Sequence, residues 1–133
     1  MSALCLAAAA MTVVLPVQSF TLSWTHSIEK ILWEEDYQIV GHKLEVVEAR
    51  VRGDGAGMEP PPDAVFKDGV YHYKPKIAPL PSFLMARSPY TKDYTLCWNN
   101  KCHPMAEVMG SVQKSPLVKA SVCDRKPTKL AIK

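Results

Sequence analysis

The chain has 133 residues, a formal net charge of +3 and 47% hydrophobic residues, which allows one domain with a modest core. Residues 1–19 contain no charged side chain, whereas residues 114–133 contain six basic residues and one acidic residue. The chain has no basic segment studded with aromatic residues, which argues against nucleic acid as a partner.

The first nineteen residues predict a signal peptide or an N-terminal anchor. Residues 3–14 are almost wholly apolar, and Val17-Gln18-Ser19 resembles a small-residue cleavage site. The segment is short for a membrane span, which needs about 20 strongly apolar residues. No basic stretch precedes it, so an upstream start or an uncleaved anchor are alternatives. We therefore expect a periplasmic or otherwise extracytoplasmic protein that contacts the membrane only through this segment or the basic tail.

Alternating apolar and polar residues predict short strands over most of the remaining chain. Asp68-Gly69 is a strong hairpin signal, and Val47, Ala49 and Val51 are expected on one face of their strand. No segment shows sustained helical periodicity. The pattern indicates an all-β domain over residues 20–110, a small sandwich or barrel of antiparallel strands, followed by a basic, poorly ordered tail. The expected strands cover residues 20–26, 32–40, 44–52, 65–66, 70–73, 83–86, 94–98 and 101–108.

The sequence Cys97-Trp-Asn-Asn-Lys-Cys102 predicts a disulfide across a hairpin. Asn99 and Asn100 tolerate the positive φ of a type I′ turn, which makes the two cysteines a directly opposed, non-hydrogen-bonded pair. The Cα atoms of such a pair lie about 4.5 Å apart, within reach of a disulfide. If Cys5 leaves with the leader, Cys123 is either unpaired or pairs with a hairpin cysteine.

The same hairpin supports an alternative function, a copper or other soft-metal site formed by Cys102, His103 and Met105. Thiolate, imidazole and thioether groups suit copper(I). However, neighbouring strand residues such as Cys102 and His103 point to opposite faces of a sheet. We therefore expect no cofactor, and keep metal binding as the alternative.

The main candidate site lies between the first two strands of the expected domain and includes His26, Ser27, Glu29 and Glu35. A serine nucleophile needs a base within hydrogen-bond reach, but adjacent strand residues His26 and Ser27 point to opposite faces. We therefore expect no enzymatic activity. The carboxylates here indicate either a ligand site or a solvated, ion-paired turn. Candidate ion-pair partners are Arg50, Arg52 and Arg87.

A glycine-rich loop at Gly55, Ala56 and Gly57 completes the candidate site. Glycines allow positive φ and close backbone approach, and exposed amides in such a loop can bind an anion. The alternative is a purely structural turn. The loop lacks the spacing and the following helix of a nucleotide-binding loop.

Three motifs in combination resemble the domain of unknown function 1850 family. They are the segments 20–30, with His-Ser-Ile-Glu-Lys at its end, 33–37 and 55–58. The resemblance places the seven residues of the candidate site in the motif positions and implies a small exported or membrane-anchored protein. It also implies an accessory or binding role beside TRAP-type uptake transporters of the TAXI class, with transporter subunits or a small-molecule ligand as partners. The cysteine hairpin departs from the family motif.

Overall fold

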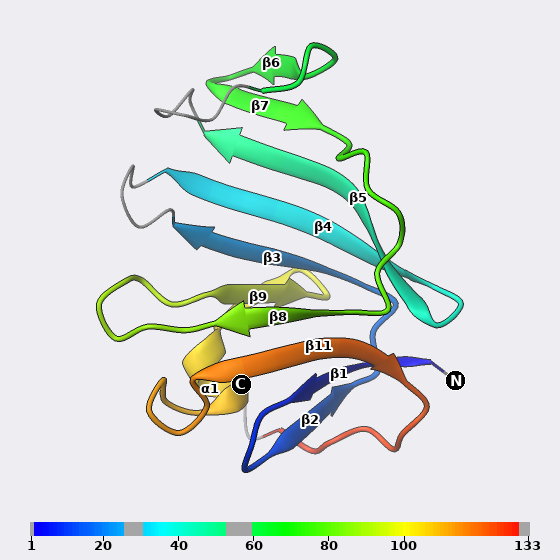
Figure 1. Cartoon of the computed structure of the whole chain (residues 1–133), viewed down its shortest axis with the longest axis vertical. Coiled ribbons are helices and arrows are strands. Elements are labelled where there is room, and N and C mark those ends of the chain that lie inside the picture. Colours follow the sequence, from blue (N-terminus) through cyan, green and yellow to red (C-terminus); the bar gives the residue numbers. More distant parts are fainter. Residues whose placement is uncertain (1, 26–30, 53–59, 131–133) are drawn as a thin grey trace.

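The computed structural model, which describes residues 2–25, 31–52 and 60–130, has two antiparallel β-sheets of seven and four strands (Figure 1). Both sheets are open, with an edge strand on either side, and one apolar core cluster draws buried residues from both. Of the two architectures expected from the sequence, the structure is therefore a sandwich. No helix within the described ranges is long and apolar enough to cross a membrane.

The seven-stranded sheet, called the large sheet, has the strand order β10-β9-β3-β4-β5-β7-β6. Its strands confirm the alternating pattern of the sequence, and the two tight hairpins have the expected turns. Asp68 and Gly69 have φ values of 53° and 80°, and Asn99 and Asn100 have φ values of 51° and 64°. The strands are β3 (Ser19–Thr25), β4 (Leu32–Val40), β5 (Lys43–Arg52), β6 (Val65–Lys67), β7 (Val70–Tyr73), β9 (Thr95–Trp98) and β10 (Lys101–Pro104).

A β-bulge in β5 corrects the expected face of Val47. Asp36 of β4 pairs with Glu48, but the next residue, Tyr37, pairs with Val46, so Val47 has no partner in the ladder. The extra residue shifts the alternation, since side chains on either side of a bulge change parity. As a result Val46 and Ala49 are both buried, whereas Val47 lines a cleft on the other side of the sheet.

The four-stranded sheet, called the small sheet, has the order β2-β1-β11-β8 and joins distant parts of the chain. Residues expected in a leader form the hairpin β1–β2, whose inward side chains enter the core. Cleavage after Ser19 stays a prediction, and the structure shows these residues as part of the sandwich. Within the expected disordered tail, β11 pairs with both β1 and β8, which corrects that expectation. The strands are β1 (Ala3–Ala7), β2 (Thr12–Leu15), β8 (Ser82–Ala86) and β11 (Leu117–Cys123).

A short helix, α1 (Met105–Met109), replaces the second half of the last predicted strand. Its buried residues Met105, Val108 and Met109 have the i, i+3, i+4 spacing of one helical face. One turn is too short for this period to be recognised against strand alternation, so the sequence-based strand over residues 101–108 is wrong beyond Pro104.

Two disulfides close the structure, Cys97–Cys102 and Cys5–Cys123. The first confirms the prediction, with its residues directly paired between β9 and β10 and their Cα atoms 4.0 Å apart. The second corrects the expected state of Cys123, which pairs with neither hairpin cysteine. It links β1 to β11, 118 residues apart in sequence.

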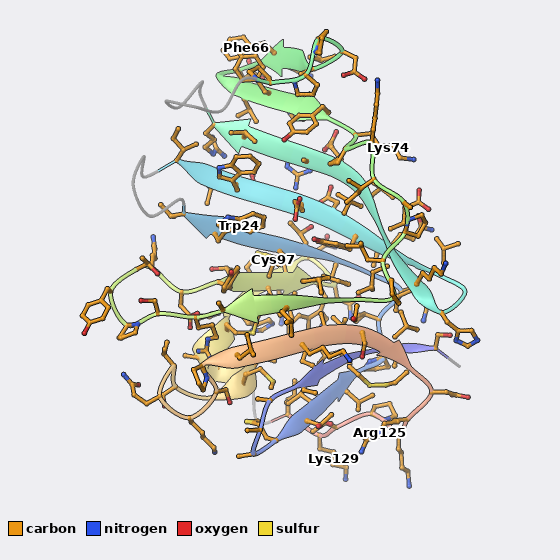
Figure 2. All side chains as sticks on the ribbon, in the orientation of Figure 1. Trp24, Phe66, Lys74, Cys97, Arg125 and Lys129 are labelled. Atoms are coloured by element: carbon orange, nitrogen blue, oxygen red, sulfur yellow. A yellow bond between two sulfur atoms is a disulfide. The ribbon has the colours of Figure 1, made fainter. Side chains whose placement is uncertain are left out.

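Beyond β11 the chain folds back along β2. The Thr128 hydroxyl accepts a hydrogen bond of 2.8 Å from the Val14 amide, and the Thr128 amide donates one of 2.9 Å to the Val14 carbonyl. Leu130 packs against the core. Arg125 and Lys129 project from this segment at the lower end of the molecule in Figure 2. The basic segment is thus held against the small sheet over its described residues.

Candidate functional site

Of the seven residues predicted for the site, the structure describes one, Glu35. The strands that lead into the other two segments end together: Trp33 pairs with Trp24 on one side and with Val51 on the other. The described ends of β3, β4 and β5 therefore lie at one end of the large sheet. The predicted residues outside the described ranges are His26, Ser27, Glu29, Gly55, Ala56 and Gly57.

Glu35 lies on the face of the large sheet that turns toward the core. The register places it opposite Leu22 of β3 and Ala49 of β5, both buried, and Ala49 opposite Tyr73 of β7. Directly opposed residues share one face of a sheet. The core cluster includes Leu22 but not Ala49. Glu35 therefore lies at the border of the core, on the side of β7 and β6, the strands farthest from the small sheet in Figure 1.

Aromatic rings lie on both sides of Glu35 along the strands. On the side of the strand ends, Trp24 stacks on Trp33 with ring centroids 6.1 Å apart, and Tyr94 tilts against Trp24 at 6.0 Å. On the other side, Tyr37 stacks at 5.0 Å on the rings of both Phe20 and Phe83. We call the half-buried surface formed by Trp24, Trp33, Glu35, Tyr73 and Tyr94 the Glu35 face.

Burial governs the electrostatics of this face. Desolvation raises the pKa of Glu35, and the hydrogen bond of 2.8 Å that the Tyr37 hydroxyl donates to its Oε1 atom offsets part of the rise. Burial also raises the pKa of Tyr37 and Tyr73, and the nearby Glu35 carboxylate raises both further. Within the described ranges, Tyr37 is the one hydrogen-bond partner of Glu35. Perturbed carboxyl groups of this kind occur often at functional sites.

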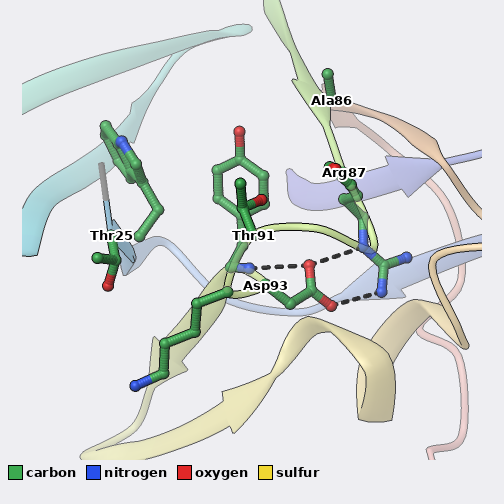
Figure 3. Close-up of a pocket in the computed structure, with 9 residues that line it drawn as sticks. Thr25, Ala86, Arg87, Thr91 and Asp93 are labelled. Atoms are coloured by element: carbon green, nitrogen blue, oxygen red, sulfur yellow. Dashed lines mark hydrogen bonds and ion pairs between the residues drawn. The ribbon is translucent and has the colours of Figure 1, made fainter. Parts of the chain in front are cut away.

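A pocket of about 260 Å³ adjoins the Glu35 face at Trp24 and Tyr94 (Figure 3). Its wall is the loop from Arg87 to Asp93, where Arg87 Nε and Nη2 donate to the two oxygens of Asp93 at 3.0 and 2.7 Å. Arg87 also donates to backbone carbonyls beyond α1, at Gly110 and Ser115. These bonds satisfy a side chain that is 0% exposed and fix the pocket wall. The sequence suggested a different partner for Arg87, a carboxylate near β4.

The opposite, outer face of β4 and β5 carries the ion pairs that the sequence offered as an alternative role for the acidic run. Arg50 binds Asp36 through two bonds of 2.7 and 2.8 Å and also binds Glu48 at 2.6 Å. Thr21 donates to Asp36 at 2.6 Å. The Arg50 bond lowers the pKa of Asp36. The acidic run is thus divided by strand alternation, with Asp36 in an ion pair on one face and Glu35 on the other.

The alternative metal site is not supported by the arrangement of its residues. Cys102 is bonded to Cys97, which leaves no thiolate for a metal ion. His103 is buried against Trp98, with ring centroids 4.4 Å apart, and Met105 is 0% exposed in the core. A search of the described residues finds no group of three or more His, Cys, Asp or Glu side chains placed to hold a metal.

A family model described as "Domain of unknown function (DUF1850)" matches residues 20–105 of this chain. No curated protein and no solved structure matches it. The matched range contains β8 and the whole of the large sheet except for the first residue of β3, and it includes Glu35 and the pocket beside Trp24. The strands β1, β2 and β11 lie outside it.

Proposed function

Because the chain belongs to the domain of unknown function 1850 family, we propose that it is a non-catalytic, extracytoplasmic module that binds a small ligand at the Glu35 face. The observation that carries the proposal is the position of Glu35: a half-buried carboxyl with a raised pKa, placed among aromatic rings at the border of the core. No described residue forms an ion pair with Glu35. Burial of a carboxyl without a charged partner costs free energy, so among the described residues a purely structural role would favour an apolar side chain there.

The matched region supports this location for the site. The family match covers the strands that form the Glu35 face and leaves out three of the four strands of the small sheet. Within it, the rigid wall of the pocket and the stacked tryptophans provide a preformed surface. Preformed, largely apolar concavities with a few placed polar groups are typical of small-molecule sites.

Two disulfides support an oxidising compartment, because such bonds rarely persist in the cytosol. In that compartment we propose an accessory role in solute uptake beside a TRAP-type transporter, through protein contact or ligand handling. The family resemblance motivates this partner. Pull-down of the full-length chain with the transporter subunits encoded beside it, if such genes are present, tests the association.

Ligand binding is tested by titrating the full-length protein with a library of small solutes and following the amide spectrum by NMR. We expect a hit to shift Trp24, Trp33 and Tyr73, and Trp33→Ala to weaken it by about tenfold. Trp98→Ala is the matched control, since Trp98 lies on β9 against His103. A ligand whose shifts map to the outer face around Asp36, or whose affinity falls equally in both variants, would contradict the site.

A further inference from the structure

We propose that the ligand of the Glu35 face is an organic ammonium ion, a protonated amine attached to an aromatic or aliphatic body. This inference rests on the binding function proposed above and adds the chemical class of the ligand. It follows from the single charge that the described residues place on the face, from the Oε2 atom of that carboxyl, which no described residue occupies, and from the rings around it.

The charge distribution on the face selects a cation. On the core-facing side of β3, β4, β5 and β7, the register brings together apolar and aromatic side chains, and Glu35 is the only charged residue among those described. The lysine and the arginines of these strands lie on the outer face, where Asp36 and Glu48 bind Arg50. A bound cation would therefore find a carboxyl that no described basic residue on this face of the sheet neutralises.

The hydrogen-bonding capacity of Glu35 fits an ammonium donor. A carboxylate accepts through two oxygens, and within the described ranges only Oε1 is occupied, by the Tyr37 hydroxyl. A primary ammonium group carries three N–H donors and no acceptor, so it can donate to Oε2 of Glu35 and to the neighbouring Oε1. The Tyr37 bond fixes the carboxyl in place, and the residue opposite Glu35 on β5 is the small Ala49.

The rings beside Glu35 fit the rest of such a ligand. Trp33 precedes Glu35 by two residues on the same strand, which places the two side chains about 7 Å apart on one face. Tryptophan faces attract cations and pack against flat or aliphatic groups. The stacked pair Trp24–Trp33 leads from Glu35 to the pocket of about 260 Å³ that Tyr94 borders. An ammonium head at Glu35 and an apolar body along the tryptophans therefore match the order of groups on the surface.

The test uses three probes of one shape and different charge: benzylamine, benzyl alcohol and benzoate. Each is titrated into the full-length protein at neutral pH and followed by NMR and by tryptophan fluorescence. We expect benzylamine to shift Trp24 and Trp33 and to bind at least about tenfold more tightly than benzyl alcohol, with benzoate weakest. Glu35→Gln should reduce this preference to about twofold or less.

Glu45→Gln is the matched control, because Glu45 lies on the outer side of the same sheet and pairs with Lys74 at 3.1 Å. It should leave the preference for benzylamine unchanged. Equal binding of benzylamine and benzyl alcohol, or a preference that survives Glu35→Gln, would overturn the inference while leaving a neutral ligand at the same face possible. Absence of any shift at Trp24 and Trp33 with benzylamine would also overturn it, and the library titration would then decide the proposed function separately. A thermal melt of each variant confirms that the compared proteins are folded.

Discussion

The two sheets of this molecule are assembled in different ways. In the large sheet β3, β4 and β5 follow one another along the chain, and β6–β7 and β9–β10 are tight hairpins. In the small sheet β11, near the C-terminal end of the chain, lies between β1, near the N-terminal end, and β8, which comes from between them in sequence. The large sheet thus depends mostly on strands that are near in sequence, apart from the pairing of β3 with β9, whereas β11 of the small sheet pairs only with strands that are distant in sequence. Most of the matched family region belongs to the locally connected part.

The two sheets also have different roles in the molecule. The large sheet carries the strand residues of the Glu35 face, and the loop between β8 and β9 lines most of the pocket beside it. The small sheet supplies apolar side chains that pack against the large sheet in the core. The disulfide Cys5–Cys123 and the return of the chain along β2 both lie in the small sheet. The long-range covalent closure of the chain therefore lies away from the proposed binding surface.

Removal of the N-terminal hairpin should have the largest effect on this arrangement. A chain that begins at Ser19 lacks β1 and β2, including four side chains that are at most 2% exposed: Leu4, Leu6, Val13 and Leu15. Truncating one such residue costs about 2–5 kcal/mol, and a domain is stable by only about 5–15 kcal/mol. We expect this chain to lack near-UV circular dichroism and a dispersed amide spectrum. A native-like spectrum would show that the large sheet folds alone and that the hairpin is dispensable.

The two disulfides provide a matched test of non-local and local closure. Replacing Cys5 and Cys123 by serine should lower the free energy of unfolding by about 4–5 kcal/mol, because this bond closes most of the chain. The same change at Cys97 and Cys102, which are 5 residues apart, should cost about 2 kcal/mol. Urea denaturation of both variants gives the comparison. A larger loss in the hairpin variant would show that register in the large sheet matters more than closure of the small one.

Two arginines allow a buried ion pair to be compared with an exposed one, because Arg87 lies in the pocket wall and Arg50 lies on the outer face of the large sheet. Arg87→Ala removes a 0% exposed side chain and leaves Asp93 and three backbone carbonyls without their donor, so we expect a loss of about 3–5 kcal/mol. Arg50→Ala on the outer face, where the side chain is 20% exposed among three carboxylates, should cost about 1 kcal/mol. Thermal or urea denaturation measures both. Similar losses would mean that the pocket wall does not depend on Arg87.

Glu35 should change how the free energy of unfolding depends on pH, and we expect this effect to be smaller than those of the variants above. Its folded-state pKa is raised above the usual value of 4.5, so the folded protein holds this proton more tightly than the unfolded chain. The contribution to stability is therefore present below 4.5 and is lost as the pH rises through the raised pKa. Relative to the wild type, Glu35→Gln should gain stability over this window and match it at lower pH. The tyrosines around it, Tyr37 and Tyr73, have raised pKa values and remain neutral there.

Urea denaturation of both proteins between about pH 4 and pH 8 gives the difference. The depressed pKa of Asp36 acts in the opposite direction, but it is common to both proteins and cancels. Parallel stability curves for wild type and variant would contradict a buried, perturbed Glu35.

Strand alternation and turn chemistry were sufficient to predict most of the large sheet, because half-buried strands show their two faces in the sequence. Leu32–Val40 and the Asn99-Asn100 turn are examples. The bulge at Val47 was not predictable, since both parities of β5 carry apolar residues. The strands within residues 3–15 were not predicted for a related reason: strands that are apolar on both faces look like the core of a leader, and the leader itself stays a prediction.

For the site, the sequence singled out Glu35 through its neighbours and its family motif, and the structure adds its surroundings. The division between Glu35 and Asp36 follows from strand alternation and was within reach of the sequence. The role of Arg87 was not, because its partners Gly110 and Ser115 are more than twenty residues away in sequence and meet it only in the folded chain.

The return of the chain along β2 has a consequence for self-association. An edge strand offers unpaired amides and carbonyls to any other strand, and two proteins can aggregate through such edges. Thr128 occupies both backbone groups of Val14 in the middle of β2 and so blocks this edge. The lysines and arginine around it add like charges that repel a second molecule. The segment that the sequence predicted to be a basic, poorly ordered tail thus covers the outer edge of β2 at Val14.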